Sequence, residues 1–251
     1  MSESTQRNHA HWNEASSTYN SRFAKTFQQV IDEIRKHHEW IGVDWAEDSS
    51  GSENEDSSVA PKKTVRLLDY ACGTGLVSRA LAPYITQSIG IDLTEGMVHE
   101  YNTAALNQGI SESEMHATRG NLIDANNPNP PELAGKEFFD FDIAAVGLGF
   151  HHFDDPALAA KRLAERLKKG GVLMIIDFVP HSHVSGHSDH SHTAAHTVTH
   201  NGFSQDDVKR MFEDAGVGAK FEYKVIGHGF VFSENEKKNN RSLFFAKGVK
   251  L

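Results

Sequence analysis

A short apolar run that stops at an acid and turns through two glycines constrains this 251-residue chain more than any other stretch. It reads Val65-Arg-Leu-Leu-Asp-Tyr-Ala-Cys-Gly-Thr-Gly-Leu-Val-Ser78. The apolar residues before Asp69 predict a buried strand, Gly73 and Gly75 permit tight backbone turns, and the residues after them have a helical period. A glycine loop between a parallel strand and a helix N-terminus is where an open α/β sheet binds its ligand. The stretch therefore predicts both a fold class and the place of a ligand site.

The spacing of the loop excludes one common ligand and favours another. A dinucleotide fingerprint runs Gly-x-Gly-x-x-Gly, but Ser78 does not supply its third glycine, and the carboxylate of Asp69 would repel a pyrophosphate. S-adenosylmethionine carries no phosphate, and its amino group and sulfonium are cationic, so we expect Asp69 to favour it. A second buried strand ends at Asp92, 23 residues further on, where a carboxylate can accept both hydroxyls of a ribose.

These residues carry a resemblance to a known family. Asp69-Tyr-Ala-Cys-Gly-Thr-Gly75 together with Ile89-Gly-Ile-Asp92 resembles the class I S-adenosylmethionine-dependent methyltransferases. The resemblance covers residues 65–250 and extends to small-molecule enzymes, including fungal secondary-metabolite ones. It implies S-adenosyl-L-methionine as cofactor and S-adenosyl-L-homocysteine as product. Ala71 stands where the family has the first glycine of its loop, a small change that we expect the loop to tolerate.

The resemblance also implies a set of cofactor contacts. Asn121 would bond the adenine amino group through its carbonyl oxygen, and the backbone amide of Leu122 would meet a ring nitrogen. Met97 follows an expected helix N-cap at Thr94 and would face the pocket, although packing in the core is the alternative. The cofactor-binding residues that we expect are Tyr19, Asp69, Ala71, Gly73, Gly75, Asp92, Leu93, Met97, Asn121, Leu122 and Gly147.

A second informative stretch lies between Phe141 and Pro156, where a buried strand runs directly into two adjacent histidines. This places His151 or His152 beside the transferred methyl group, and the layout is common in methyltransferases that act on small molecules. Both are candidate catalytic residues, because a histidine can accept a proton near neutral pH. Their side chains diverge at a strand end, so we expect one to be the base and the other to be structural.

The order of predicted elements indicates a doubly wound α/β fold, because strand and helix patterns alternate. We expect a mostly parallel, seven-stranded Rossmann-like methyltransferase sheet with an antiparallel C-terminal hairpin. The helix after the fourth strand should end at a glycine cap formed by Gly170 and Gly171. The expected strands are 65–70, 87–92, 115–119, 141–147, 171–178, 219–232 and 241–248, and the expected helices are 75–82, 95–107, 155–168 and one from Ser204 to Gly216.

We expect three parts along the chain. Residues 1–43 form an N-terminal helical lid, in which 1–10 are loose, 23–40 are an amphipathic helix, and Trp12 and Tyr19 either reach the pocket or pack on the core. Residues 44–63 are rich in acids without an apolar period, which favours a disordered loop over an interaction tail or a phosphorylation site. Residues 64–251 form the S-adenosylmethionine-binding methyltransferase domain.

Histidines crowd the segment between Pro180 and Asn201. They stand at positions 181, 183, 187, 190, 192, 196 and 200. Such density is typical of metal sites, but no cysteine accompanies them, so we expect a loop over the active-site mouth and no required metal.

Composition limits the partners and the compartment. The formal net charge of −9 argues against a nucleic-acid surface, and no apolar run approaches a membrane span of about 20 residues. The single cysteine, Cys72, excludes an intrachain disulfide and favours a reducing compartment, the cytoplasm or the nucleus.

The function that we expect is methyl transfer from S-adenosylmethionine to an O, N, S or C atom of a small-molecule metabolite, by a monomer or homodimer. A protein methyltransferase is one alternative, weakened because Gly147-Leu-Gly-Phe150 replaces the Asn/Asp-Pro-Pro-aromatic motif of amide and nucleobase-amine enzymes. A methyltransferase-like regulatory subunit is another, and the complete set of cofactor motifs speaks against it.

Overall fold

The computed structural model describes residues 1–46, 63–181, 194–231 and 240–251. Its centre is a seven-stranded sheet with the order β3-β2-β1-β4-β5-β7-β6, in which β1 to β5 are parallel and β7 is antiparallel to both neighbours. The predicted α/β fold with its C-terminal hairpin is confirmed. The strands are β1 Arg66–Tyr70, β2 Gln87–Asp92, β3 Met115–Arg119, β4 Phe141–Gly147, β5 Leu167–Phe178, β6 Ala219–Val231 and β7 Asn240–Val249.

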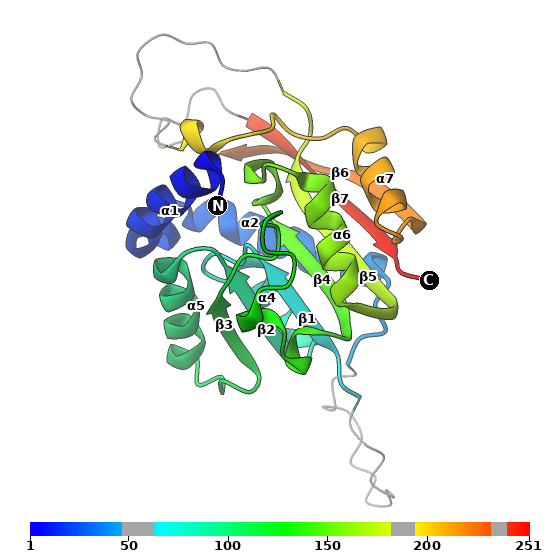
Figure 1. Ribbon diagram of the computed structural model, residues 1–251, viewed down its shortest axis with the longest axis horizontal. Coiled ribbons are helices and arrows are strands. Elements are labelled where there is room, and N and C mark those ends of the chain that lie inside the picture. Colours follow the sequence, from blue (N-terminus) through cyan, green and yellow to red (C-terminus); the bar gives the residue numbers. More distant parts are fainter. Residues whose placement is uncertain (47–62, 182–193, 232–239) are drawn as a thin grey trace, which may run out of the picture.

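Helices cover both faces of this sheet (Figure 1). On one face, α2 (Ala24–Lys36) and α4 (Leu76–Leu81) share an apolar core with β1, β4 and β5. On the other face, α6 (Pro156–Arg166) and α7 (Gln205–Asp214) pack on a second core. The remaining helices are α1 Glu3–Arg22, α3 His38–Ile41 and α5 Glu95–Asn107, and short 3-10 turns lie at η1 Ala82–Tyr84, η2 Pro131–Leu133, η3 Lys136–Phe138, η4 Phe150–His152 and η5 Ala195–Thr197.

The central strands are buried on both faces, which is why their sequences are continuous apolar runs without alternation. Leu67 of β1 pairs in register with Ile143 of β4 and Ser88 of β2. Because these strands are parallel, their carboxyl ends meet at one edge of the sheet. The glycine loop and the two histidines follow strands at this edge, and Asp92 is the last residue of β2 there.

The N-terminus differs from the expectation of a loose segment. α1 begins at Glu3, where the Ser2 hydroxyl accepts a hydrogen bond from the amide of Thr5. Its only buried residues are Asn8 and Ser16, so the sequence has no apolar period to reveal it. The apolar stretch expected at 23–40 is divided into α2 and α3.

The end of α6 also differs. The helix stops at Arg166, β5 starts at Leu167, and the Gly170–Gly171 pair does not form the cap. Instead, the ammonium group of Lys250 donates to the carbonyls of Ala164 and Leu167, at 2.8 and 2.7 Å. A side chain from the C-terminal strand segment therefore satisfies the carbonyls that a glycine cap would have served.

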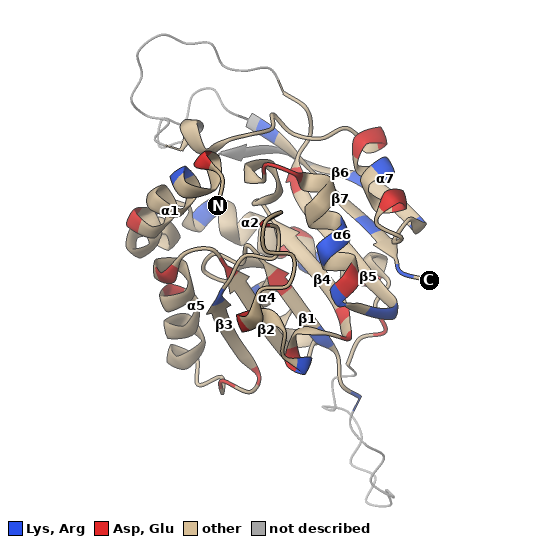
Figure 2. Ribbon diagram, viewed as in Figure 1, with Lys and Arg blue, Asp and Glu red and all other residues tan. Residues whose placement is uncertain are grey.

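Figure 2 shows basic residues interspersed with acidic ones over α6 and α7, without a single basic patch in that view. No helix of the described residues is long and apolar enough to cross a bilayer. Most of the acidic segment expected at 44–63 lies outside the described residues, as does most of the histidine-rich segment.

Candidate active site

A pocket of about 420 Å³ opens at the carboxyl edge of β1, β2 and β4 and is roofed by α1. It brings together most of the residues expected to contact the cofactor. Eight of those eleven residues line it, and so does His152, one of the two candidate catalytic residues. The eight are Tyr19, Ala71, Gly73, Asp92, Leu93, Met97, Asn121 and Gly147. Asp69, Gly75, Leu122 and His151 do not line it, and each instead supports a residue or loop that does.

The glycine loop after β1 has three residues with positive φ: Ala71 at 53°, Gly73 at 52° and Gly75 at 89°. A Cβ atom at Gly75 would also lie 3.0 Å from the ring of Tyr101. Both the positive φ and the lack of space therefore favour glycine at this position. Ala71 accepts the same backbone shape at a cost of about 1–2 kcal/mol, because its Cβ crowds the following carbonyl. The loop thus keeps its shape with one alanine in it.

Asp92 ties the loop to the next helix and faces the pocket. One carboxylate oxygen accepts from the amide of Gly73 at 2.9 Å, and the other accepts from the amide and hydroxyl of Thr94, both at 3.0 Å. Burial raises its pKa, although these hydrogen bonds act in the opposite direction. A carboxylate has about four acceptor sites, so capacity remains for hydroxyl donors from a ligand. Ribose hydroxyls are donors of the kind that this remaining capacity could accept from.

Asp69 does not line the pocket, although the sequence predicted it as a cofactor contact. Its carboxylate accepts from the amide of Ser78 at 3.0 Å and from the hydroxyl at 2.6 Å, so it holds the first turn of α4. The Ser78 hydroxyl is bonded in turn to Ser88 and Tyr101, all buried. The side chain points under the glycine loop because these donors lie there. Asp69 therefore supports the turn from the glycine loop into α4.

Asn121 lies in the pocket wall, whereas Leu122 is turned away from it. The Asn121 side-chain oxygen accepts from the amide of Ile123 at 3.0 Å and from the hydroxyl of Tyr70 at 3.3 Å. The same hydroxyl accepts from the Leu122 amide at 3.2 Å. The backbone amide assigned to an adenine nitrogen by resemblance is thus already bonded to Tyr70, and the Leu122 side chain is buried in the core.

Met97 and Leu93 flank the start of α5. Thr94 is the N-cap, as predicted, because its hydroxyl accepts from the amide of Met97. The Met97 side chain is 3% exposed and lines the pocket. It therefore packs in the core and also forms part of the pocket wall.

The two histidines of η4 have different environments. The His151 ring nitrogen Nδ1 lies 2.8 Å from a carboxylate oxygen of Asp177, and its backbone amide donates to the same carboxylate at 3.0 Å. Both residues are buried, so this pair fastens η4 to β5. His152 lines the pocket, and its Nδ1 lies 2.9 Å from the carbonyl oxygen of Thr197.

The contact with Thr197 decides the tautomer of His152. A carbonyl oxygen only accepts, so Nδ1 carries the proton and the lone pair of the neutral ring is on Nε2. Burial lowers the pKa of His152 well below its ordinary value of 6.5, and the neighbouring His151 ring acts in the same direction. His152 is therefore a neutral imidazole at physiological pH. Among the described residues, Nε2 has no hydrogen-bond partner.

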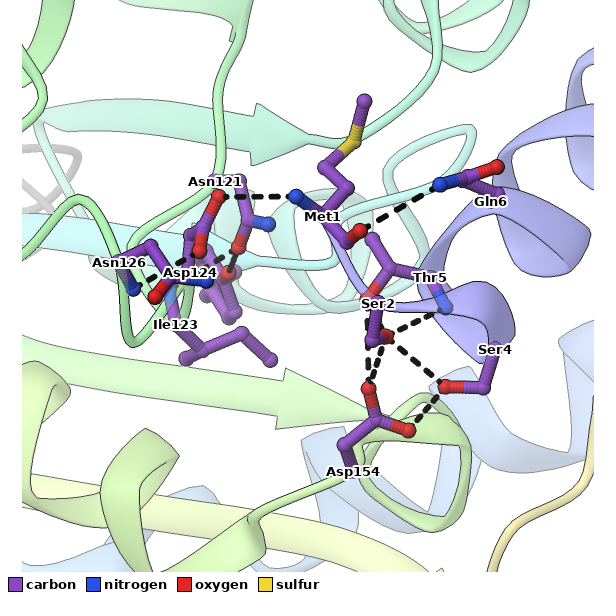
Figure 3. Close-up of polar contacts among 11 residues, drawn as sticks. Met1, Ser2, Ser4, Thr5, Gln6, Asn121, Ile123, Asp124, Asn126 and Asp154 are labelled. Atoms are coloured by element: carbon purple, nitrogen blue, oxygen red, sulfur yellow. Dashed lines mark hydrogen bonds and ion pairs between the residues drawn. The ribbon is translucent and has the colours of Figure 1, made fainter.

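The start of α1 closes the pocket mouth through contacts that join distant parts of the sequence. The Asp154 carboxylate accepts hydrogen bonds from the hydroxyls of Ser2, Ser4 and Thr5, and Figure 3 shows these side chains converging on it. The Met1 amino group lies 3.5 Å from Asp124 on the opposite rim. Trp12 and Tyr19 both line the pocket, in T-shaped contact at 5.6 Å between ring centroids.

Sequence reasoning missed several residues of this wall. Asn8, Asp124, Asp154 and Asp155 line the pocket, but they lie in a polar helix or in loops where nothing local marks them. The Asp154-Asp155 pair, separated from the two histidines by Phe153 alone, was the one available signal, since it lies just after β4 at the carboxyl edge of the sheet.

No cluster of three or more metal-ligating side chains exists within the described ranges. Of the seven histidines between positions 181 and 200, the structure describes His181, His196 and His200. The ring of His196 packs edge-on against His11 of α1 at 5.0 Å. The other four lie outside the described residues.

The glycine loop, the acid after β2 and the sheet order with its antiparallel β7 define an S-adenosylmethionine-dependent methyltransferase. A family model described as a methyltransferase domain matches residues 26–218, and the chain belongs to that family. An uncharacterized methyltransferase of Schizosaccharomyces pombe is 28% identical over 201 residues, which is 76% of this chain and 68% of that protein. A ubiquinone biosynthesis O-methyltransferase of Aromatoleum aromaticum is 25% identical over 60% of this chain and 56% of its own length.

Solved structures show the same fold. Magnesium protoporphyrin IX methyltransferase from Synechocystis, with bound S-adenosylhomocysteine, superposes with a TM-score of 0.55 over 93% of this chain and 87% of its own, at 12% identity. Phosphoethanolamine N-methyltransferase 2 of Haemonchus contortus, in complex with S-adenosylmethionine, gives 0.54 over 76% of this chain and 50% of its own, at 15% identity. At these identities the likeness concerns the fold alone.

Proposed function

We propose that this enzyme methylates a small, uncharged or cationic molecule on a protonated oxygen, sulfur or nitrogen atom, with His152 as the proton acceptor. The observation that carries the proposal is a neutral histidine in the pocket wall whose Nε2 lone pair is unused among the described residues. S-adenosylmethionine, when bound, supplies an electrophilic methyl group on its sulfonium.

We assign the cofactor to the residues that follow β1, β2 and β3. Gly73 brings the backbone close to the ligand, Asp92 accepts from the ribose hydroxyls, and Asn121 lies where the adenine would end. Met97 and Leu93 supply apolar surface for the adenine ring. The polar lining agrees with these assignments. Asp92 is an acceptor at the pocket wall, and no lysine or arginine is among the described lining residues.

His152 then takes the proton that the acceptor releases. As the acceptor atom bonds the methyl carbon and the carbon–sulfur bond breaks, the acceptor proton moves to Nε2 and later leaves to solvent. The lowered pKa keeps Nε2 unprotonated at neutral pH, so the base is available. His151 contributes by holding η4 against Asp177, which fixes where the next residue stands.

The charge of the lining selects the acceptor class. Trp12, Tyr19 and Phe153 give aromatic surface, and Asp124 and Asp154 stand at the mouth. Among the described lining residues no lysine or arginine offers a counter-charge to a carboxylate or phosphate. An anionic acceptor would lose hydration without a partner, which is costly. The roof formed by α1 also suits a small acceptor better than a protein chain.

The test is a panel of matched acceptors with release of S-adenosylhomocysteine as the readout. Catechol and tyramine represent uncharged and cationic phenols, phenylmethanethiol represents thiols that are protonated at neutral pH, and 3,4-dihydroxybenzoate is the anionic match to catechol. We expect turnover with at least one of the first three and at least about tenfold lower kcat/KM for the carboxylate, equivalent to about 1.4 kcal/mol. A preference for 3,4-dihydroxybenzoate over catechol would overturn the assigned acceptor class.

A further inference from the structure

Asn8 is a buried amide in a mostly polar helix that has few buried side chains. It is 6% exposed, and α1 buries only one other residue, Ser16. A buried amide is costly unless its polar atoms are bonded, and both of those of Asn8 are. Its Oδ1 accepts from the indole nitrogen of Trp12 at 3.1 Å. Asn8 thereby orients the aromatic ring that α1 presents to the pocket.

The other atom of this amide reaches three carbonyl oxygens. Nδ2 donates to Ser4 at 3.1 Å, to Thr197 at 3.3 Å and to His152 at 3.4 Å. The first belongs to α1 itself, whereas the other two lie 189 and 144 residues along the chain. One side chain therefore connects α1, η4 and η5.

Two of these contacts converge on the proton acceptor assigned above. The Thr197 carbonyl that Asn8 holds also accepts from Nδ1 of His152 at 2.9 Å. The Trp12 indole that Asn8 holds packs against the His152 ring, with centroids 5.3 Å apart. Asn8 thus contacts the Trp12 indole of α1 and the Thr197 carbonyl of η5, and both of these groups contact the His152 imidazole.

The charged and titratable groups around His152 come from every element that packs on it. His151 lies with its ring centroid 4.0 Å away, backed by Asp177 of β5. The charge of His11, on α1, lowers the pKa of His152. Asp154 comes two residues after His152 in the chain and also lines the pocket. None of these groups hydrogen-bonds the His152 ring among the described residues, so its orientation depends on Thr197.

We propose that Asn8 is a positioning residue: by holding the Thr197 carbonyl and the Trp12 indole, it fixes the orientation and the Nδ1-protonated tautomer of His152 while α1 is docked. The inference rests on the proposed function, in which Nε2 of His152 takes the acceptor proton. It adds a consequence for the reaction, since the proton acceptor is assembled only when the lid covers the pocket. Undocking α1 would leave the imidazole free to turn.

The decisive measurement is the tautomer of His152 in protein saturated with S-adenosylhomocysteine and labelled with ¹⁵N-histidine. Long-range ¹H–¹⁵N spectra distinguish protonated from unprotonated ring nitrogens, and a His152→Ala sample assigns the signals. Asn8→Leu keeps the branched shape and the number of heavy atoms of the side chain but removes both hydrogen-bonding atoms. We expect a single Nδ1-protonated form in the wild type and exchange between tautomers in the variant, with the His152 pKa moving up toward 6.5.

Asn13→Leu is the matched control on the same helix. The Asn13 side chain accepts from the amide of Gly96 at 2.8 Å, which docks α1 on α5 away from His152. It should leave the His152 tautomer and titration as in the wild type. If catechol is a substrate, Asn8→Leu should lower kcat at least about tenfold while the dissociation constant of S-adenosylhomocysteine stays within about twofold.

Wild-type tautomer and titration in Asn8→Leu would overturn the proposal, as would equal changes in Asn8→Leu and Asn13→Leu. If Asn8→Leu does not fold, Asn8→Ala gives the same readout. The spectra need no acceptor, so positioning by Asn8 is judged separately from the base. Full turnover by His152→Ala would instead refute the proposed base.

Discussion

Replacing Asp69 by asparagine should change how the stability of this enzyme depends on pH. Burial raises the pKa of Asp69 to about 7 from its ordinary value of 3.8, even though Ser78 donates two hydrogen bonds to it. Between these two values the folded state holds a proton that the unfolded state releases. Asp69 therefore contributes stability that is fully present below 3.8 and is lost as the pH rises through about 7.

The size of the effect follows from that window. From about pH 5 to about pH 8, roughly two units of the shift are titrated, which corresponds to about 3 kcal/mol at about 1.4 kcal/mol per unit. The neutral amide of the variant Asp69→Asn would have no such term. Its oxygen can still accept from Ser78, and any cost of the new amino group is the same at both pH values. The pH-dependent difference between variant and wild type isolates the carboxyl group.

The assay is urea unfolding of the cofactor-free protein at both pH values, with the free energy taken by linear extrapolation. Asp69→Asn should gain about 3 kcal/mol relative to wild type on going from the lower to the higher pH. Asp214→Asn, at an exposed acid at the end of α7, controls for the loss of one carboxyl group. Parallel wild-type and Asp69→Asn curves across this range would refute the reasoning, because they would mean that Asp69 releases its proton equally in both states.

Three further outcomes are expected. His152→Ala should lower the chemical rate by about 10²–10⁴, whereas His151→Ala should mainly lower the melting temperature, and equal rates for both variants would contradict this. The wild-type activity should fall only below pH 6.5, because the pKa of the base is lowered. Asp92→Ala should weaken binding of S-adenosylhomocysteine by about 1.5–3 kcal/mol, measured by calorimetry, and an unchanged affinity would place the ribose elsewhere. Gly96→Ala would put a methyl group 2.5 Å from the nearest α1 side-chain atom, so amide exchange in α1 should accelerate; His99→Ala on the exposed side of α5 should leave it unchanged.

Features decided within a few residues were predictable from sequence. The caps at Thr94 and Ser204 depend on a hydroxyl and an amide three residues apart, and both are present. The central strands are buried on both faces, so their composition alone marks them. The same locality explains why Asp92 and Gly73 were placed at the pocket, since Asp92 ends β2 and Gly73 lies in the loop that follows β1 at the carboxyl edge.

Features decided by distant contacts were not predictable. Whether Asp69 faces the ligand or α4 depends on where Ser78 stands after the loop has turned. The choice between His151 and His152 depends on Asp177 and Thr197, which lie 26 and 45 residues away. No local pattern distinguishes the two histidines, because they are adjacent and of the same type.

The way in which the first half of α1 is attached has a thermodynamic consequence. Its contacts are mostly hydrogen bonds: hydroxyls on Asp154, the amide of Asn8 on two carbonyls, and Asn13 on a backbone amide. Separating such groups exposes little apolar surface, and it is apolar hydration that gives unfolding its large heat capacity. The Trp12 ring, which packs against His152, adds some apolar area, so opening of this half of the lid should have a small heat-capacity change compared with that of the core. Its closed population should follow a nearly straight van't Hoff line, while the apolar core beneath it, built on β1 and β4, unfolds with strong curvature.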